Sequence, residues 1–566
     1  MLVLNPPATE EQQIVKAAGQ IGFYTLFSRI TGLFRDIAIG AVFGAGSVTD
    51  TFFTAFRIPN MLRRVVGEGA SAAALVPVIT EYRERRSPAE TIEMIRALLG
   101  VGLLVLLVLT IVGILWAVPL TSLLVPGFSP VKLSQTAIQL RMMFPYLLFI
   151  GLSAIAMGIL HAFRHFAAPA FAPTLLNIAL IGATLFVRKF SAGTIGTPAL
   201  FLAGAVVGGG LGQLLWQLPV LRRLDVLVLP NWNPGHPAVR QIGVLLVPVL
   251  FSSLLYQVSL IVKNLLASLL SEGSVSSLWY ATRVFDFPQG VFVLALSSAA
   301  LPSLTIQAQR GDLAGVRESL GFALRLINFV VFPAGVGLTV LAIPICAVLF
   351  FHGAFDAEAV RDAAQALRWM ALGLWSVAAV RLLTSCLYAL QDTRSPLVAA
   401  VLAFIASVVF GVMFMGHIVA QPDSGKIVQF FAALSARITI GHLEAGGLTL
   451  ASSLSATVNV LLLGAILVRR LGGFPWRAWG NSLLWSVLGS LVMIGPVWWV
   501  ERQVDWLDRG VPYVFRVGML AVAIMAGVVS FVLVAWWGGK REFATLMRML
   551  PDRLFRRLPQ FLQSEL

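Results

Sequence analysis

Long apolar segments dominate this 566-residue chain, and they are what most restricts its fold. A helix needs roughly 20 apolar residues to cross a bilayer. Fourteen segments meet this length, at about 14–43, 49–80, 95–118, 135–160, 170–187, 197–219, 241–270, 274–305, 319–351, 364–390, 395–419, 447–468, 479–500 and 511–538. Charged residues make up 12% of the chain, about half the share in soluble domains. The sequence therefore predicts an all-α polytopic membrane protein with about 14 transmembrane helices.

The loops between these segments predict an orientation. An even number of spans puts both termini on one side, and the loops on that side, with the C-terminal tail, carry 20 Lys and Arg residues against nine on the other. The positive-inside rule then makes both termini cytoplasmic. Residues 1–13 are polar and contain prolines, so we expect no signal peptide. This topology accounts for most of the net charge of +15, and we expect no nucleic-acid partner.

An internal repeat predicts how the spans are grouped. At a shift of 226 residues, Ala55-Phe56-Arg57 falls on Ala281-Thr282-Arg283, and 73–75 falls on 299–301. Six helices per repeat give two lobes of the same orientation in a parallel repeat, with a site expected between them. The predicted parts are a cytoplasmic N-terminus (1–13), an N-lobe (14–219), a cytoplasmic loop (220–240), a C-lobe (241–468), two further helices (469–538) and a basic amphipathic tail (539–566). That tail fits either binding to anionic inner-leaflet lipids or an ordinary solvated segment.

Charged residues inside the first two spans carry the functional prediction. A charge at membrane depth costs at least ~2.5–3.5 kcal/mol, so such residues face a protein-lined or watery cavity. The set is Arg29, Arg35, Asp36, Asp50, Arg57, Arg63, Arg64 and Glu68. Arginine cannot be deprotonated and grips phosphate oxygens in a bidentate way. The chain therefore predicts a central cationic cavity that moves or holds an anion, and a diphosphate is a natural match.

Several of these charges also have a purely structural interpretation. Arg64 and Glu68 are four residues apart and can pair on one helix face. Asp50 lies near the outer end of the second span and can cap its own helix. Arg63 has no acidic residue three or four positions away, which favours a cavity role. We expect Arg35 to point away from its sequence neighbour Asp36.

Other positions give weaker predictions. Near Arg283, Asp286 follows three residues later, so a local pair is plausible there. Four arginines nearer span ends are expected to extend to the membrane interface: Arg141, Arg325, Arg381 and Arg516. Cys346 and Cys386 lie in apolar runs and are expected to fill space rather than form a disulfide.

The motifs that are missing argue against an enzyme. The chain has no G-x-x-x-x-G-K-[ST] loop and no H-E-x-x-H. A membrane transferase would need clustered acids and a metal, and no such cluster is evident. We expect a transporter without a cofactor or metal.

Two blocks of sequence resemble a known family. The first runs from Ser28 to Asp36 (S-R-x-x-G-x-x-R-D) and continues from Phe43 to Ala70. The second runs from Gly273 through Arg283 to 301–304 (Leu-Pro-Ser-Leu). These motifs resemble the MurJ/MviN family of lipid II flippases. The resemblance implies the multidrug/oligosaccharidyl-lipid/polysaccharide exporter fold, with residues 469–538 forming a groove for the lipid tail.

The same resemblance implies a substrate, partners and site residues. The substrate would be lipid II, an undecaprenyl-diphosphate-linked disaccharide peptide, flipped across the bacterial inner membrane by alternating access; cell-wall synthesis proteins are possible partners. The implied substrate-binding residues are Arg29, Arg35, Arg63 and Arg283. The implied acidic cavity or gating residues are Asp36, Asp50, Glu68 and Asp286.

This chain departs from the family pattern at two places. Members often carry an acidic residue where Thr282 stands here. Members thought to bind sodium often carry Asp where this chain has Lys263, and residues 395–419 contain no Asn, Asp or Gln. We therefore expect no sodium site. Either the Lys263 ammonium takes the place of the ion, or coupling differs and Lys263 pairs with a carboxylate; the membrane potential is the candidate driving force.

Three other functions stay open. A flippase for another polyprenyl-linked glycan is barely separable from the sequence. A cation-coupled drug exporter of the same superfold would prefer acidic and aromatic cavity residues, so the arginines argue against it. A non-transporting scaffold that binds cell-wall lipid or division proteins is the third. Residues 420–446 are long for a loop, and we expect an extra surface helix there.

Overall fold

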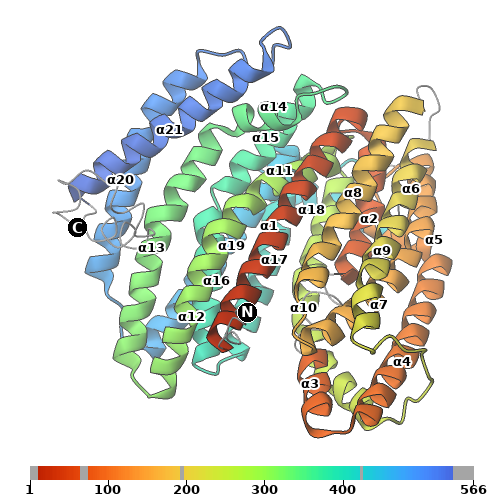
Figure 1. The fold of residues 1–566 in the computed structure, drawn as a ribbon. Helices are drawn as coiled ribbons and strands as arrows, with labels where there is room; N and C mark the ends of the chain where they lie inside the picture. The colour runs from red at the N-terminus through yellow and green to blue at the C-terminus, as the bar shows by residue number, and fades with distance from the viewer. Residues whose placement is uncertain (1–9, 64–73, 191–196, 421–424, 539–566) are drawn as a thin grey trace, which may run out of the picture. The chain divides into compact units, whose positions relative to one another are not determined.

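The structure is a computed structural model, and it describes residues 10–63, 74–190, 197–420 and 425–538. All regular structure in those ranges is helical, which confirms the predicted all-α class (Figure 1). The chain divides into two compact units, Met1–Ser276 and Ser277–Leu566. Each unit is considered separately below.

The described part of the first unit is a bundle of helices. Its helices are α1 (Glu10–Phe43), α2 (Ser47–Arg63), α3 (Val76–Arg85), α4 (Pro88–Leu115), α5 (Ala117–Leu124), α6 (Pro130–Met143), α7 (Pro145–Ala162), α8 (Ala167–Phe190), α9 (Thr197–Arg223), α10 (Pro237–Ser268) and the start of α11 (Ser274–Pro288). Two begin at sequence signals for helix starts: Ser87 and Glu90 form a capping box on α4, and Ser129 caps α6 with Pro130 as its first residue.

Within this unit α8 packs against α1 and α9, while α2 packs mainly against α6. A core cluster where α3, α4 and α7 meet includes Ile79, Met94 and Ile159, each nearly or fully buried. Large apolar side chains on α4, such as Leu104, Val108 and Ile111, are instead exposed. A helix with an exposed apolar surface of this length suits a lipid environment.

The second unit contains the remainder of α11 and ten further helices among its described residues. They are α12 (Leu294–Gln309), α13 (Leu313–Val340), α14 (Ala342–Phe350), α15 (Ala357–Ala371), α16 (Leu374–Ala389), α17 (Arg394–Met415), α18 (Lys426–Ile438), α19 (Glu444–Arg470), α20 (Trp476–Glu501) and α21 (Tyr513–Gly538). A π-helical turn at Gln289–Val293 joins α11 to α12. Such turns are rare and often accompany functional positions.

In this unit α17 packs against α19, and α20 packs against both α13 and α21. Phe329, Met493 and Phe531 form the apolar contact that holds α13, α20 and α21 together. The extra surface helix expected in residues 420–446 is confirmed as α18. The space-filling prediction for Cys346 and Cys386 is also confirmed, because both are free and buried.

The described helices include nine that are long and apolar enough to cross a membrane. A tenth span results if α15 and α16, which meet at a 44° bend, count as one. The predicted number of fourteen is not confirmed by these residues and stays a prediction. The division into two six-helix lobes at residues 219 and 241 also stays a prediction. The boundary between the two compact units falls elsewhere in the sequence, between Ser276 and Ser277.

Candidate functional site

Two of the predicted site residues, Arg35 and Asp36, form a buried ion pair in the middle of α1. Nη2 of Arg35 lies 2.8 Å from Oδ1 of Asp36, and Nε of Arg35 donates to the same oxygen. Asn177 of α8 completes the cluster, because its Oδ1 accepts from Nη1 of Arg35 at 3.0 Å. Its amide nitrogen donates to the Ser28 carbonyl. The cluster joins α1 to α8 and satisfies most of the Arg35 guanidinium.

The expectation that Arg35 points away from Asp36 is therefore wrong. Backbone positions i and i+1 diverge on a helix, but the long arginine side chain turns back and reaches its neighbour. Arg29 behaves differently. It is exposed and forms no hydrogen bond or ion pair with another described residue. Of the two α1 arginines, Arg29 is the one with its guanidinium available to a ligand.

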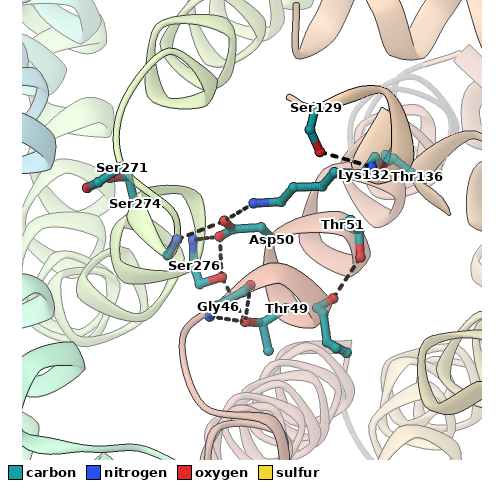
Figure 2. A network of polar contacts seen from close by, with 12 residues as sticks. Gly46, Thr49, Asp50, Thr51, Ser129, Lys132, Thr136, Ser271, Ser274 and Ser276 are labelled. Atoms are coloured by element: carbon teal, nitrogen blue, oxygen red, sulfur yellow. Dashed lines mark hydrogen bonds and ion pairs between the residues drawn. The ribbon is translucent and has the colours of Figure 1, made fainter. Parts of the chain in front are cut away.

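Asp50 lies in the first turn of α2 and accepts hydrogen bonds from the start of α11. Its Oδ2 accepts from the Gly273 amide at 2.9 Å, and its Oδ1 accepts from the Ser276 amide at 2.8 Å and from the Ser276 hydroxyl. Asp50 is 1% exposed. Figure 2 shows the carboxylate between the first turn of α11 and the side chain of Lys132. The sequence suggested that Asp50 caps its own helix, α2, but its carboxylate accepts from the start of α11 instead.

Lys132 of α6 balances the charge of Asp50. Its Nζ lies 2.8 Å from Oδ2 of Asp50, and the side chain is only 11% exposed. The ammonium also lies 4.3 Å from the centre of the Phe128 ring. The Asp50 latch, defined as Asp50, Lys132, Gly273 and Ser276, thus holds three helices of the first unit at one point.

The backbone at Gly273 is shaped for this latch. Gly273 has φ +88, and a Cβ atom there would lie 3.0 Å from the Ala45 carbonyl oxygen. Only glycine adopts such a φ readily and allows so close an approach. Asp50 and Ser276 are 226 residues apart, the offset of the predicted repeat. Two positions that the predicted repeat aligns are therefore direct hydrogen-bond partners.

Arg283 on α11 has two neighbours within its own helix. Its Nη1 lies 3.8 Å from Oδ2 of Asp286, which confirms the local pair, and its guanidinium lies 4.5 Å from the Trp279 ring centre. Both charged side chains keep contact with solvent, since they are 24% and 44% exposed. Thr282 donates to the Leu278 carbonyl. A half-buried guanidinium on an aromatic face is held in place and still accessible to an anion.

The remaining predicted residues are less well defined by the structure. Arg63, the last described residue of α2, donates from Nε to Oδ1 of Asn60 at 3.2 Å. Pro59 lies inside α2. Arg64 and Glu68 fall outside the described residues, so their predicted pairing stays a prediction. Arg57, which the repeat aligns with Arg283, also lies on α2 and is partly buried.

The structure offers little for a resident metal ion. Among the described residues, no group of three or more His, Cys, Asp or Glu side chains could hold one. Lys263 is half-buried on α10, and the described helix α17 carries no Asn, Asp or Gln. An ammonium group at Lys263 would repel a cation nearby.

Two residues of these clusters were missed by sequence reasoning. Asn177 lies 142 residues from Arg35, and Lys132 lies 82 residues from Asp50. Lys132 was counted only as a loop charge, although its position at the start of an apolar segment was a usable signal. Asn177 was a lone amide within an apolar run, which is a signal for a buried polar contact.

Comparisons with known proteins agree with one another. A sequence model of the family described as "Lipid II flippase MurJ" matches residues 39–421. The lipid II flippase MurJ of Burkholderia cenocepacia is 33% identical, covering 92% of this chain and 97% of that protein. The probable lipid II flippase MurJ of Vibrio cholerae is 31% identical, covering 93% of this chain and 96% of that protein.

Solved structures show the same fold. A lipid II flippase MurJ in an inward closed conformation matches with a TM-score of 0.70 at 23% identity, covering 91% of this chain and 98% of that one. An inward-facing multidrug resistance MATE family transporter of the MOP superfamily matches with a TM-score of 0.60 at 14% identity, covering 79% of this chain and 94% of that one. These likenesses concern the fold alone.

Proposed function

Because the chain belongs to the MurJ family of lipid II flippases, we propose that it moves lipid II from the inner to the outer leaflet of the bacterial cytoplasmic membrane. A flippase is a transporter, and the chain is not an enzyme. The observation that carries this proposal is the 33% identity to the Burkholderia flippase over 92% of the chain. The work of the protein then belongs to peptidoglycan synthesis and cell-wall biogenesis.

The arginines divide into two roles in this proposal. Arg29, Arg63 and Arg283 each contact the diphosphate or sugar head group at some stage of transport. Arg35 instead holds α1 to α8, because Asp36 and Asn177 already occupy its guanidinium. An arginine satisfied by protein partners has fewer donors left for a phosphate. Asp286 keeps Arg283 oriented, and Glu68 is a candidate partner for the cavity cations.

The Asp50 latch is the gating element in this proposal. Alternating access requires one arrangement that admits the head group from the cytoplasm and another that releases it outside. Ser276 is the last residue of the first unit, and α11 continues into the second unit. Releasing Asp50 from the start of α11 would free this end of α11 from α2 and α6. Hydrogen bonds to two amides, a hydroxyl and an ammonium can break and reform without any covalent change.

The driving force in this proposal is the membrane potential. Each charge that crosses 100 mV is worth ~2.3 kcal/mol. Outward movement of an anionic head group from an inside-negative cell is favoured by that sign. No sodium site is proposed, and Lys263 is proposed to supply a fixed positive charge in place of an ion. Both termini are proposed to be cytoplasmic, with anionic inner-leaflet lipids contacting the tail at 539–566.

Rescue of bacteria depleted of their own lipid II flippase tests the proposal. Wild type, Arg283→Ala and Arg188→Ala would be compared at equal expression; Arg188 is an exposed arginine at the end of α8 and serves as the matched control. We expect rescue by wild type and Arg188→Ala, and loss of rescue with Arg283→Ala. Rescue by all three would remove Arg283 from the binding role. Failure of well-expressed wild type would point to a different polyprenyl-linked glycan as substrate.

A further inference from the structure

Arg516 is a buried charge in the first turn of α21. Its side chain belongs to a residue that is 5% exposed, and its Nε and Nη1 atoms have no hydrogen-bond partner. No described residue forms an ion pair with it. Its guanidinium lies 5.4 Å from the centre of the Phe351 ring. The burial of Arg516 does not fit the expected side chain that extends freely into water at the membrane interface, because protein side chains enclose it.

A second arginine lies against the same ring. The guanidinium of Arg509 is 5.2 Å from the Phe351 centre, and its Nη2 donates to the Gly353 carbonyl at 2.8 Å. The two guanidinium carbons are thus at most about 11 Å apart. His352 packs edge-on against Tyr513, with ring centres 5.1 Å apart. The two positive groups near Phe351 come from α21 and from the loop before it.

Nearby acidic residues do not neutralise this cluster. Asp505 and Asp508 lie in the same loop as Arg509, but their carboxylates accept from the amides of Leu507 and Gly510. Within the described part of the chain, neither forms an ion pair with Arg509 or Arg516. A third source of positive potential is the N-terminus of α21, whose first N–H groups have no partner within the helix.

An unpaired buried charge is strongly destabilising, and proteins retain one only where a partner is present. A cation at a helix N-terminus is unfavourable in addition, because it opposes the helix dipole. An anion bound between Arg516, Arg509 and the N-terminus of α21 would be attracted by all three, so the unfavourable interactions among these positive groups would be offset. The planar fork of arginine and a helix N-terminus are each well suited to phosphate oxygens.

We propose that Arg516, Arg509 and the first turn of α21 bind a phosphate-type oxyanion, supplied in the membrane by the headgroup phosphate of an anionic phospholipid. α21 is long and apolar enough to cross a membrane, so its first turn lies near a membrane surface. Val514 and Phe515, which precede Arg516, are 80% and 51% exposed and would contact acyl chains. Arg509 is exposed and gives the headgroup a way in. The lipid would fix α21 against the α14 segment, a role separate from transport of lipid II.

Thermal stability of the full-length purified chain tests this proposal. Wild type, Arg516→Gln and Arg502→Gln would be measured in neutral detergent alone, with phosphatidylglycerol, with phosphatidylcholine and with inorganic phosphate. Arg502 is the matched control, since it is exposed at the other end of the same loop and lies over Trp498. Native mass spectrometry of the same samples would count retained phosphatidylglycerol molecules.

The proposal predicts the direction in which the melting temperature of each protein changes. In detergent alone Arg516→Gln is at least as stable as wild type, because the unpaired charge is gone. Phosphatidylglycerol then raises the melting temperature of wild type and Arg502→Gln but not of Arg516→Gln, and the variant retains at least tenfold less of this lipid. Binding that stabilises the native state has this effect by mass action.

Other outcomes count against the proposal. Equal stabilisation of all three proteins by phosphatidylglycerol would overturn the site. Equal stabilisation of wild type by inorganic phosphate and by phosphatidylglycerol, lost in Arg516→Gln, would keep the oxyanion site and overturn its lipid source. If Arg516→Gln does not fold, Arg509→Gln carries the same comparison, because Arg509 is exposed and tolerates replacement. The result does not depend on rescue of lipid II export.

Discussion

Replacing Asp50 is predicted to be more damaging than replacing its partner Lys132. Asp50→Ala removes the acceptor for four donors at a site that is 1% exposed. Leaving one partner of a buried pair without the other costs about 3–5 kcal/mol. Loss of the cap on α11 adds about 0.5–2 kcal/mol. Lys132 keeps some solvent contact and the Phe128 ring, so we expect a total near the lower end, about 4 kcal/mol.

Lys132→Met leaves a carboxylate that still accepts from two amides and a hydroxyl. Hydrogen bonds of this kind stabilise the ionised form. We expect a loss of about 1.5–3 kcal/mol, typical of a hydrogen bond to a charged group. The contrast between the two single replacements follows from the number of partners that each side chain has.

The double-mutant cycle of Asp50→Asn and Lys132→Met measures the coupling. Unfolding in mixed micelles, followed by the fluorescence of the chain's 14 tryptophans, gives the free energies. Hydrogen exchange of the peptide around 270–280 reports the latch locally, and the amide of Ser276 should exchange faster in Asp50→Ala. We expect a coupling energy of about 1–3 kcal/mol. Additivity within about 0.5 kcal/mol, or a loss with Lys132→Met as large as with Asp50→Ala, would refute the reasoning.

Three further outcomes are expected. Gly273→Ala should lower the free energy of unfolding by about 1–3 kcal/mol, because φ is +88 and the new Cβ meets the Ala45 carbonyl. Gly311→Ala is the control, since φ is +72 with open space around it, and should cost about 1 kcal/mol. Equal losses in the unfolding titration would count against the close approach at Gly273. Asn177→Ala should lower the free energy of unfolding by about 1–3 kcal/mol, because it removes the acceptor for Nη1 of Arg35 and the donor to the Ser28 carbonyl. The same unfolding titration checks this. A change below about 0.5 kcal/mol, that of a surface substitution, would show that the cluster is not needed for stability. Hydrogen bonds from Ser395 lower the pKa of the Asp392 carboxyl, and Arg470 lowers it further. The ionised carboxyl therefore adds stability above its unfolded pKa of about 3.9, and this stability is lost as the pH falls through the folded pKa. The fall in melting temperature on acidification should be smaller in Asp392→Asn, and an unchanged pH profile would contradict the assignment.

The sequence predicted the classes of side chain at the site better than their contacts. Apolar segment length was enough for the helices, because lipid requires the backbone bonds of a helix to close within the segment. The pair between Arg283 and Asp286 was predictable, since three residues of separation put both on one helix face. The pair between Arg35 and Asp36 was not, because it depends on Asn177 of another helix holding the guanidinium in place. The burial of Arg516 was not predictable for the same reason: sequence position indicates depth along a span but not which helix covers the side chain.

The hydrogen bonds of the Asp50 latch join two positions that are aligned by the repeat predicted from the sequence. The predicted repeat aligns Asp50 with Ser276, because its offset of 226 residues separates them, and the two residues share hydrogen bonds. Acidic residues at both positions would repel each other. The chain avoids this repulsion by keeping the acid at one position and a small hydroxyl at the other. The difference between Asp50 and Ser276 is therefore what makes one of the two helix starts an acceptor and the other a donor.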